Sequence, residues 1–204
     1  MIGNPKESFV CVAGLKGAGK DEFCRHMVAA HGYQSVRFSD PIREEATRRY
    51  KDYTVQQLIE IGNEGRRMHG AGYWAEQLML RAKSMGWQRL VINGIRNPGE
   101  IDAVGKSSSW PITLVGITAP SMVRFERISK RGQIEDLPDI AKFLVMDDAD
   151  RGLDQPADGQ QVDRCMALVP HDRLYNNAGT LEAYHAWIDG IHEDIEARRR
   201  AAKH

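Results

Sequence analysis

Residues 9–23 read "FVCVAGLKGAGKDEF", a stretch that joins an apolar run, a glycine-rich loop and the start of an amphipathic pattern. Gly14, Gly19 and Lys20 have the GxxxxGK spacing of a phosphate-binding loop, and Gly17 adds a third glycine. Such loops use glycines because backbone N–H groups must converge on an anion, and the following helix adds its positive N-terminal end. The strand–loop–helix order predicts a nucleotide cradle in which Lys20 reaches the β- and γ-phosphates of a nucleoside triphosphate. The alternative is a glycine-rich turn without a ligand.

The residue after Lys20 is unusual for such a loop. Asp21 stands where Ser or Thr normally supplies a hydroxyl ligand to Mg²⁺. A carboxylate is also a hard oxygen donor, and Mg²⁺ keeps several waters, so Asp21 would bind the ion directly or through water. Alternatively, Asp21 is only a helix-start acid that favours the dipole. The residues that we expect to bind ATP and Mg²⁺ here are Gly14, Lys16, Gly17, Ala18, Gly19, Lys20 and Asp21.

Short apolar runs alternate with longer helical patterns along the rest of the chain. The runs predict strands at 9–14, 35–38, 89–94, 112–118 and 173–176. The helical patterns include 20–30, 55–68, 74–85 and a final helix that follows Thr180. This alternation indicates βαβ units and a parallel sheet that is covered by helices on both faces.

The segment 129–163 differs, because it is rich in charge, glycine and proline and has one helical pattern around 139–146. In a nucleotide-binding α/β fold, a polar insertion between the fourth and fifth strands would be a mobile lid. A solvated helical hairpin is the alternative.

Three arginines precede or open this segment. Arg124, Arg127 and Arg131 fall at spacings of three and four, which predicts one helical face of arginines opposite Phe125 and Ile128. We expect this face to close over the phosphates of ATP, with Arg127 and Arg131 as the preferred pair. The alternative is a solvated basic face.

Composition limits the partners and the compartment. Lys+Arg and Asp+Glu are equal at 28 each, so no net field draws the 204-residue chain to nucleic acid or a membrane surface. The three cysteines have no paired spacing, which suits a reducing cytosol. No signal peptide and no apolar run of 18 residues is evident, so we expect a cytoplasmic protein, a monomer or a homodimer. The seven histidines have no metal-ligand spacing, and His26 and His31 are interpreted as structural or surface residues.

Five stretches carry a family resemblance: "GLKGAGKDEF" (14–23), "FSDPIREEA" (38–46), "LVINGIRNPGEID" (90–102), "ITAPSMVRFERISKRG" (117–132) and "LYNNAGTLEAY" (174–184). They resemble an archaeal dephospho-CoA-kinase-like family, and the first and last also resemble phage deoxynucleoside monophosphate kinases. The resemblance implies a single three-layer P-loop NTPase domain. In it, a five-stranded parallel sheet is flanked by helices, with a core of 8–128 and 164–204, a helical lid at about 124–163 and acceptor-binding helices at about 41–87.

The resemblance also implies roles for residues outside the loop. Asp40 would position the acceptor or accept its proton, unless it only caps the following helix. Arg43 and Arg96 would grip an acceptor phosphate through their planar forks, unless they form surface ion pairs. Asn177 and Gly179 match a turn that contacts adenine, and an ordinary Asn/Gly turn is the alternative.

Asn93 lies in the third of the resembling stretches, and Arg66 and Arg67 lie between the second and the third. Asn93 departs from the resembling families, which often carry an acid there that helps to hold Mg²⁺. Arg66 and Arg67, in "GNEGRRMHGAG" (62–72), are interpreted as a solvated helix end, and the alternative is that they reach the same acceptor. The activity we expect is ATP-dependent transfer of the γ-phosphoryl group to a small phosphorylated acceptor. A (deoxy)nucleoside monophosphate leads, dephospho-CoA is the runner-up, and a non-catalytic nucleotide-binding module is the alternative.

Overall fold

The computed structural model of the protein describes residues 7–130 and 139–202. In these ranges one parallel sheet runs in the order β2-β3-β1-β4-β5. The strands are β1 (Ser8–Ala13), β2 (Gln34–Arg37), β3 (Arg89–Asn93), β4 (Thr113–Thr118) and β5 (Leu174–Asn176). Because β1 is the central strand, the loop that follows it opens in the middle of the carboxyl edge, where ligands of α/β sheets bind.

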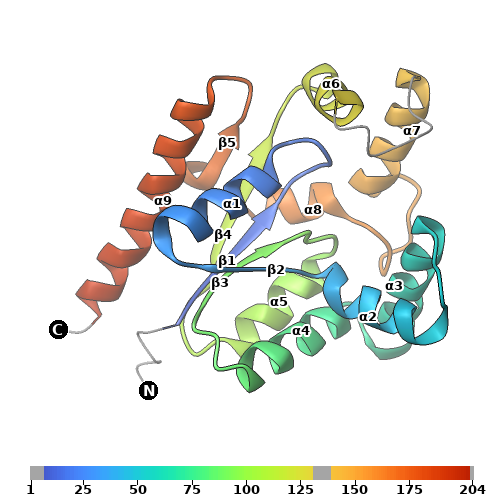
Figure 1. The fold of residues 1–204 in the computed structure, drawn as a ribbon, viewed down its shortest axis with the longest axis horizontal. Helices are drawn as coiled ribbons and strands as arrows, with labels where there is room; N and C mark the ends of the chain where they lie inside the picture. Colours follow the sequence, from blue (N-terminus) through green and yellow to red (C-terminus); the bar gives the residue numbers. More distant parts are fainter. Residues whose placement is uncertain (1–6, 131–138, 203–204) are drawn as a thin grey trace.

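Helices connect the strands (Figure 1). They are α1 (Lys20–His31), α2 (Ser39–Arg49), α3 (Val55–His69), α4 (Tyr73–Ser84), α5 (Pro98–Ser107), α6 (Ser121–Lys130), α7 (Ile140–Arg151), α8 (Val162–Ala167) and α9 (Leu181–Ala201), and a 3-10 turn (His171–Arg173) precedes β5. Their ends follow local chemistry. Thr54 and Gln57 form a capping box at α3, and Asn97 and Glu100 form another at α5.

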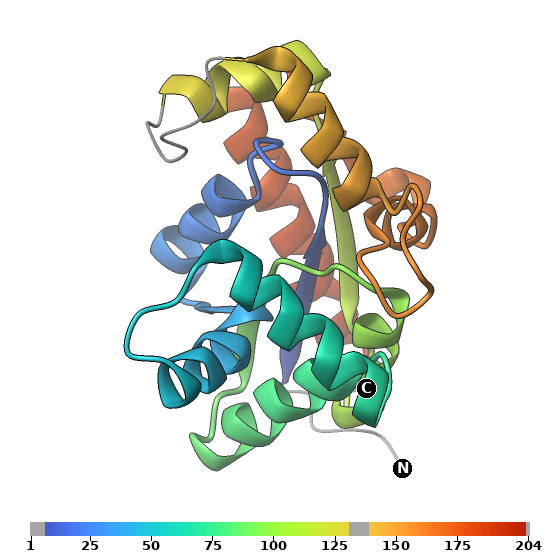
Figure 2. The same ribbon diagram turned by 90° about the vertical axis from the view of Figure 1, so that its right-hand side faces the viewer.

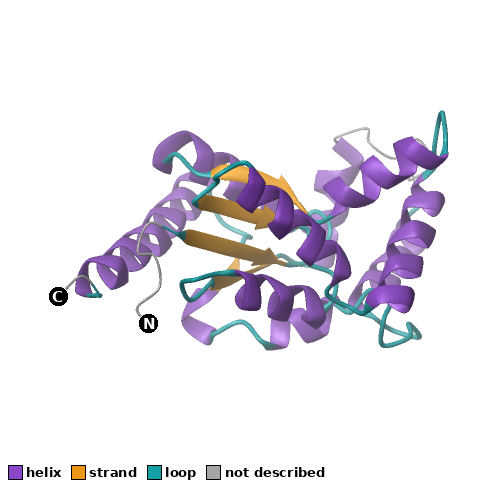
Figure 3. Ribbon diagram, turned by 90° about the horizontal axis from the view of Figure 1, so that it is seen from below, coloured by secondary structure: helices purple, strands orange, loops and turns teal. Residues whose placement is uncertain are grey.

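Helices cover both faces of the sheet (Figure 3), and a large apolar cluster lies on each face. Side chains of β1 alternate between them, as the two-residue period of a strand requires. Phe9 and Cys11 pack with residues of α4 and α5, whereas Val10 and Val12 pack with residues of α1 and α9. The prediction of a three-layer α/β fold with a five-stranded parallel sheet is therefore confirmed.

Two helical pairs lie near the carboxyl edge of the sheet (Figure 2). α2 and α3 share a small cluster that includes Ile42 and Ile61. α6 and α7 share another, in which Ile128 packs on Phe143. Residues from both pairs line one cavity beside the glycine loop, so the sheet, α2–α3 and α6–α7 together position the candidate site.

Within residues 7–130 and 139–202, no helix has both the length and the apolar character needed to cross a membrane.

Candidate functional site

The loop 14–19 is held by close contacts that only glycine permits. Gly17 and Gly19 have φ angles of 79° and 114°, in the left-handed region that side chains rarely adopt. A Cβ at Gly17 would lie 2.8 Å from the carbonyl oxygen of Arg124, and one at Gly19 would lie 2.2 Å from Nδ2 of Asn177. The glycines of the sequence motif therefore keep the loop bare and allow α6 and the turn after β5 to press against it.

Lys20 is the first residue of α1, at the positive end of that helix. Its Nζ donates to the carbonyl oxygen of Leu15, 2.9 Å away, so the side chain folds back over the loop. Burial, with the Arg96 guanidinium nearby, lowers the pKa of Lys20 to about 7. An anion in the loop would reverse this shift, because an opposite charge favours the protonated form.

A polar cavity of about 240 Å³ adjoins this lysine. It is lined by Lys16, Gly17, Lys20, Asp21, Arg37, Ser39, Asn93, Gly94, Arg96 and Ile128. Four of these side chains are cationic and one is a carboxylate. The cavity therefore suits an anionic group better than a neutral one.

Asp21 and Asn93, which both line this cavity, contact each other. Nδ2 of Asn93 donates to Oδ1 of Asp21 at 2.7 Å, and the Arg37 guanidinium lies 3.8 Å from the same oxygen. Oδ1 of Asn93 is buried and has no hydrogen-bond partner among the described residues. A buried acceptor without a partner costs free energy unless a donor such as a bound water satisfies it.

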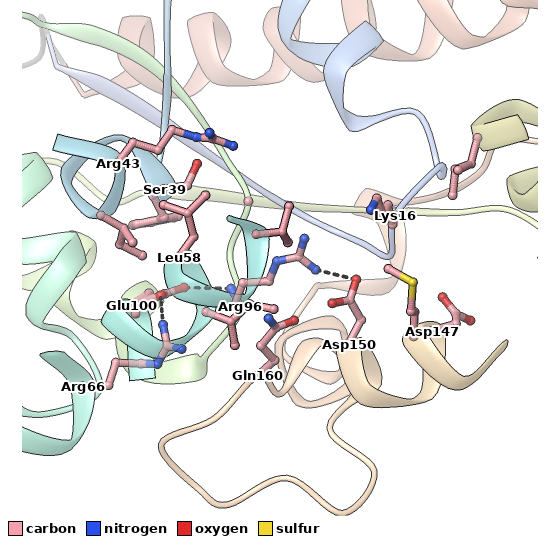
Figure 4. Close-up of a pocket in the computed structure, with 18 of the residues that line it drawn as sticks. Lys16, Ser39, Arg43, Leu58, Arg66, Arg96, Glu100, Asp147, Asp150 and Gln160 are labelled. Carbon is pink, nitrogen blue, oxygen red and sulfur yellow. Dashed lines mark hydrogen bonds and ion pairs between the residues drawn. The ribbon is translucent and has the colours of Figure 1, made fainter. Parts of the chain in front are cut away.

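A second cavity, of about 360 Å³ (Figure 4), adjoins the first. The two share Lys16, Ser39, Gly94, Arg96 and Ile128. Its apolar side comes from both helical pairs, and includes Phe38, Ile42, Leu58, Ile59, Phe143 and Met146. Its charged side carries Lys16, Arg43, Arg66, Arg96, Glu100, Asp147 and Asp150. Such a cavity accommodates a molecule with one apolar part and one charged part.

Arg66 and Glu100 form a buried ion pair at the wall of this cavity, with N and O atoms 3.5 Å apart. Burial raises the pKa of Glu100, while the charge of Arg66 and the N–H groups of Arg96 and Asn97 oppose that shift. Arg96 in turn reaches Oδ2 of Asp150 at 2.9 Å. The interpretation of Arg66 as a solvated helix end is wrong. Its guanidinium donates hydrogen bonds to Oδ1 of Asn63 and to the carbonyl oxygen of Asp158, and it pairs with Glu100.

The arginines of α6 do not share one exposed face. Arg124 is 1% exposed and its guanidinium pairs with both carboxylate oxygens of Asp147 on α7, at 2.5 and 2.6 Å. Ile128 is buried on the same side of α6, one turn further on, so the expectation that Arg124 lies opposite Ile128 is wrong. Arg131 lies outside the described residues.

Arg127 lies beside the glycine loop rather than in either cavity. It donates to the carbonyl oxygen of Asn177 at 2.9 Å, and more weakly to those of Gly17 and Ala18. Nδ2 of Asn177 donates to the Ala18 carbonyl at 2.8 Å, so the side chain of Asn177 braces the loop. A Cβ added at Gly179 would meet no described atom within 4 Å.

Asp40 is the second residue of α2 and contacts the backbone just before that helix. α2 begins at Ser39, and Oδ2 of Asp40 accepts the backbone N–H of Arg37 at 2.8 Å. Among the described residues that line the two cavities, Asp40 is absent, and Ser39 takes its place. The carboxylate closes the turn before α2, although no side chain caps this helix. The role of Asp40 toward an acceptor stays a prediction.

Several cavity residues were missed from the sequence. Glu100 was detectable only as the last position of the Asn97-x-x-Glu100 capping pattern, which predicts a helix start and not a cavity wall. Asp150 lies in the charged segment after β4, where one acid could not be singled out.

All three cysteines lie within the described ranges and are free, and burial raises the pKa of each thiol to about 12. They are protonated at neutral pH.

Comparison with solved structures identifies the class of fold. The chain superposes on a shikimate kinase from Acinetobacter baumannii in complex with shikimate with a TM-score of 0.57 and 15% identity, covering 94% of each chain. A gluconokinase from Sinorhizobium meliloti gives a TM-score of 0.52 and 14% identity, covering 95% of this chain and 97% of that one. At these identities the likeness shows that the chain has the same fold as these two kinases.

Comparison of sequences identifies the family. The chain is 30% identical over 169 residues to a UPF0200 protein of Methanopyrus kandleri, covering 81% of each chain. It is 29% identical over 181 residues to a UPF0200 protein of Thermoplasma acidophilum, covering 87% of this chain and 91% of that one. No family model matches the chain. The chain belongs to the UPF0200 family.

Proposed function

We propose that this protein is an ATP-dependent phosphotransferase, a kinase, that moves the γ-phosphoryl group to a small phosphorylated acceptor. A nucleoside or deoxynucleoside monophosphate is the leading acceptor class. The observation that carries this proposal is the placement of Lys20 and the bare glycine loop at the end of the central strand. There they open on a cationic cavity that continues into a partly apolar one.

Phosphoryl transfer needs positioning and charge neutralisation rather than covalent chemistry by the protein. The loop N–H groups and Lys20 would hold the β- and γ-phosphates of ATP. Lys16 and Arg96 line both cavities, so their charges lie where the transferred group would pass from donor to acceptor. Arg127 would approach the nucleotide from α6, and we assign the same role to Arg131. The turn at Asn177 and Gly179 would border the adenine.

Magnesium fits the part of the polar cavity that Asp21 and Asn93 line. Asp21 supplies a carboxylate there, and the unsatisfied Oδ1 of Asn93 would accept a hydrogen bond from a water of the ion. When bound, the ion would neutralise charge on the β- and γ-phosphates. Asn93 itself brings no charge, so Asp21 would be the principal protein group that holds the ion.

The acceptor would occupy the cavity of about 360 Å³. Arg43 and Arg96 would bind its phosphate, because a guanidinium fork matches phosphate oxygens. The apolar wall of Ile42, Leu58 and Phe143 would hold a flat base. The volume is at the lower end for ligand pockets, which favours a compact nucleotide over dephospho-CoA, whose pantetheine arm would extend outside.

A nucleotide-binding module that turns over slowly, if at all, is the second candidate. Asn93 is the observation in its favour, because an amide replaces a charged group at the end of β3. Turnover separates the two candidates: a module would hold ATP without any acceptor-dependent release of ADP.

The experiment measures ADP release from Mg-ATP. Each common ribo- and deoxyribonucleoside monophosphate, and dephospho-CoA, is offered singly as acceptor. Lys20→Ala tests dependence on the loop, and Lys106→Ala, an exposed lysine on α5, is the matched control. We expect stimulation by one nucleotide class, lost in Lys20→Ala and kept in Lys106→Ala. Stimulation by dephospho-CoA alone would correct the acceptor. ATP binding without stimulation by any acceptor would contradict the kinase proposal and favour the module.

A further inference from the structure

A cluster of histidines lies between α1 and α9, on the face of the sheet opposite α4 and α5. α1 contributes His26 and His31, and α9 contributes His185, Asp189 and His192. The α9 residues are four and three positions apart, so they share one helical face. Among the described residues that line the two cavities, none of these five appears, so the cluster is separate from the proposed kinase site.

Three side chains of the cluster converge on one point. Oδ1 of Asp189 lies 2.6 Å from Nε2 of His26 and 2.8 Å from Nε2 of His31. The three ligand atoms all lie within 4.8 Å of one another. The histidine side chains are 16% and 15% exposed, whereas that of Asp189 is 45% exposed. The point is thus open to solvent on the Asp189 side and enclosed on the imidazole side.

The other two histidines hold the converging rings in place. The ring of His185 stacks on that of His26 with centroids 4.1 Å apart, and the ring of His192 stacks on that of His31 at 4.0 Å. Nε2 of His185 is fixed in turn by Oε1 of Glu22 at 2.8 Å. Orientation of ligand rings by a surrounding layer of contacts is typical of metal sites.

We propose that His26, His31 and Asp189 form a binding site for a divalent cation of the late first-row transition metals. Zn²⁺ is the ion used to test it. Two imidazoles and one carboxylate are ligands that Zn²⁺ takes at about 2.0–2.2 Å, with water in the fourth position. Tetrahedral ligand atoms at such distances lie about 3.4 Å apart. The Nε2–Oδ1 separations would therefore open by less than about 1 Å, which a half-exposed aspartate allows.

The ligand set also predicts selectivity. Imidazole nitrogen suits Zn²⁺, Ni²⁺ and Cu²⁺, whereas Mg²⁺ prefers oxygen ligands and retains its water. The site therefore differs in chemistry from Asp21, where the kinase proposal puts Mg²⁺. A cation here would connect α1, which begins at Lys20, to α9, which follows the turn at Asn177. It would stabilise the folded protein by mass action, since the unfolded chain does not bring the three ligands together.

The test uses the full chain, freed of metal by chelation, and its titration with Zn²⁺ followed by calorimetry. Co²⁺ provides a second readout, because its visible absorption reports imidazole ligands in a four-coordinate site. The variants are His26→Gln, His31→Gln and Asp189→Asn, the last of which keeps an oxygen acceptor for both rings. His171→Gln is the matched control, since His171 is exposed and outside the cluster. Circular dichroism of each variant verifies folding.

We expect one Zn²⁺ per chain, an affinity at least tenfold lower in each of the three variants, and no change in His171→Gln. Thermal stability should rise with Zn²⁺ in the unchanged protein and the control only. An excess of Mg²⁺ should not displace Zn²⁺. Absence of binding, or binding that survives Asp189→Asn and His26→Gln unchanged, would overturn the proposal and leave the cluster as a hydrogen-bonded contact between two helices. Neither outcome depends on kinase activity.

Discussion

The ion pair between α6 and α7 makes a quantitative prediction about stability. The Arg124 and Asp147 side chains are 2% and 4% exposed and pair through two parallel bonds. Asp147→Leu would leave a guanidinium buried without its counter-charge. Removal of one partner of a buried pair typically costs 3–5 kcal/mol, so we expect a loss of about 4 kcal/mol in the free energy of unfolding. For a chain of this size that is a fall of roughly 10 °C in Tm.

The double variant Arg124→Met/Asp147→Leu separates two causes of lost stability, which are the burial of an unpaired charge and the loss of packing. Replacement of both members of a buried pair by apolar side chains is often close to neutral. Arg124 also donates to the carbonyl oxygens of Ala119 and Lys16, and each lost bond costs about 1 kcal/mol. The double variant should therefore lie within about 2 kcal/mol of the unchanged protein, well above Asp147→Leu alone.

The assay is urea denaturation followed by circular dichroism. Glu44→Leu is the control, because the Glu44 and Arg81 side chains form an ion pair at 62% and 47% exposure. Such a pair contributes less than about 1 kcal/mol. Two results would contradict this prediction. In one, Asp147→Leu lowers the free energy of unfolding no more than Glu44→Leu does. In the other, the double variant loses as much unfolding free energy as Arg124→Met and Asp147→Leu lose together.

The remaining predictions concern the loop and its ligands. The pKa of Lys20, about 7 in the free protein, lies below its ordinary value, so Lys20 is mostly neutral at about pH 8. ATP binding should then take up a proton and weaken as pH rises above 7; calorimetry in buffers of different ionisation enthalpy measures the uptake, and no uptake would contradict the shift. Gly19→Ala should weaken ATP binding at least tenfold, because its Cβ would meet Asn177, whereas Gly105→Ala in α5, with open space, should bind ATP normally. Asp21→Asn should raise the Mg²⁺ concentration needed for half-maximal ADP release severalfold; an unchanged magnesium titration would remove Asp21 from the metal site.

Local sequence patterns accounted for the fold. The apolar run 9–14 and the GxxxxGK spacing each depend on residues within a few positions of one another, and the structure has β1, the loop and α1 there. Helix boundaries were also near the expected ones, because caps such as Thr180 are local. The turn before α2 is local in the same way, because the Asp40 carboxylate accepts the backbone N–H of Arg37, three residues before it.

The parts of the site that were missed depend on contacts between distant segments. Arg66 and Glu100 come from α3 and α5, and nothing near Arg66 in the sequence indicates that its charge is buried. Arg124 looked like part of a basic face because its partner Asp147 is 23 positions away, on another helix. The histidine cluster brings His26 next to Asp189, 163 positions apart, so no spacing rule could have found it.

The proposed function requires the two adjoining cavities to bind ATP and its acceptor together. The most direct measurement follows the labelled γ-phosphate of Mg-ATP in the presence of a deoxynucleoside monophosphate mixture, and identifies the product that carries the label. We expect label on a nucleoside diphosphate, with the transfer abolished by Lys20→Ala and strongly reduced by Arg96→Ala, because both side chains line the polar cavity that would hold the phosphates of ATP. Label found only in inorganic phosphate, at the same rate with and without the nucleotides, would contradict it.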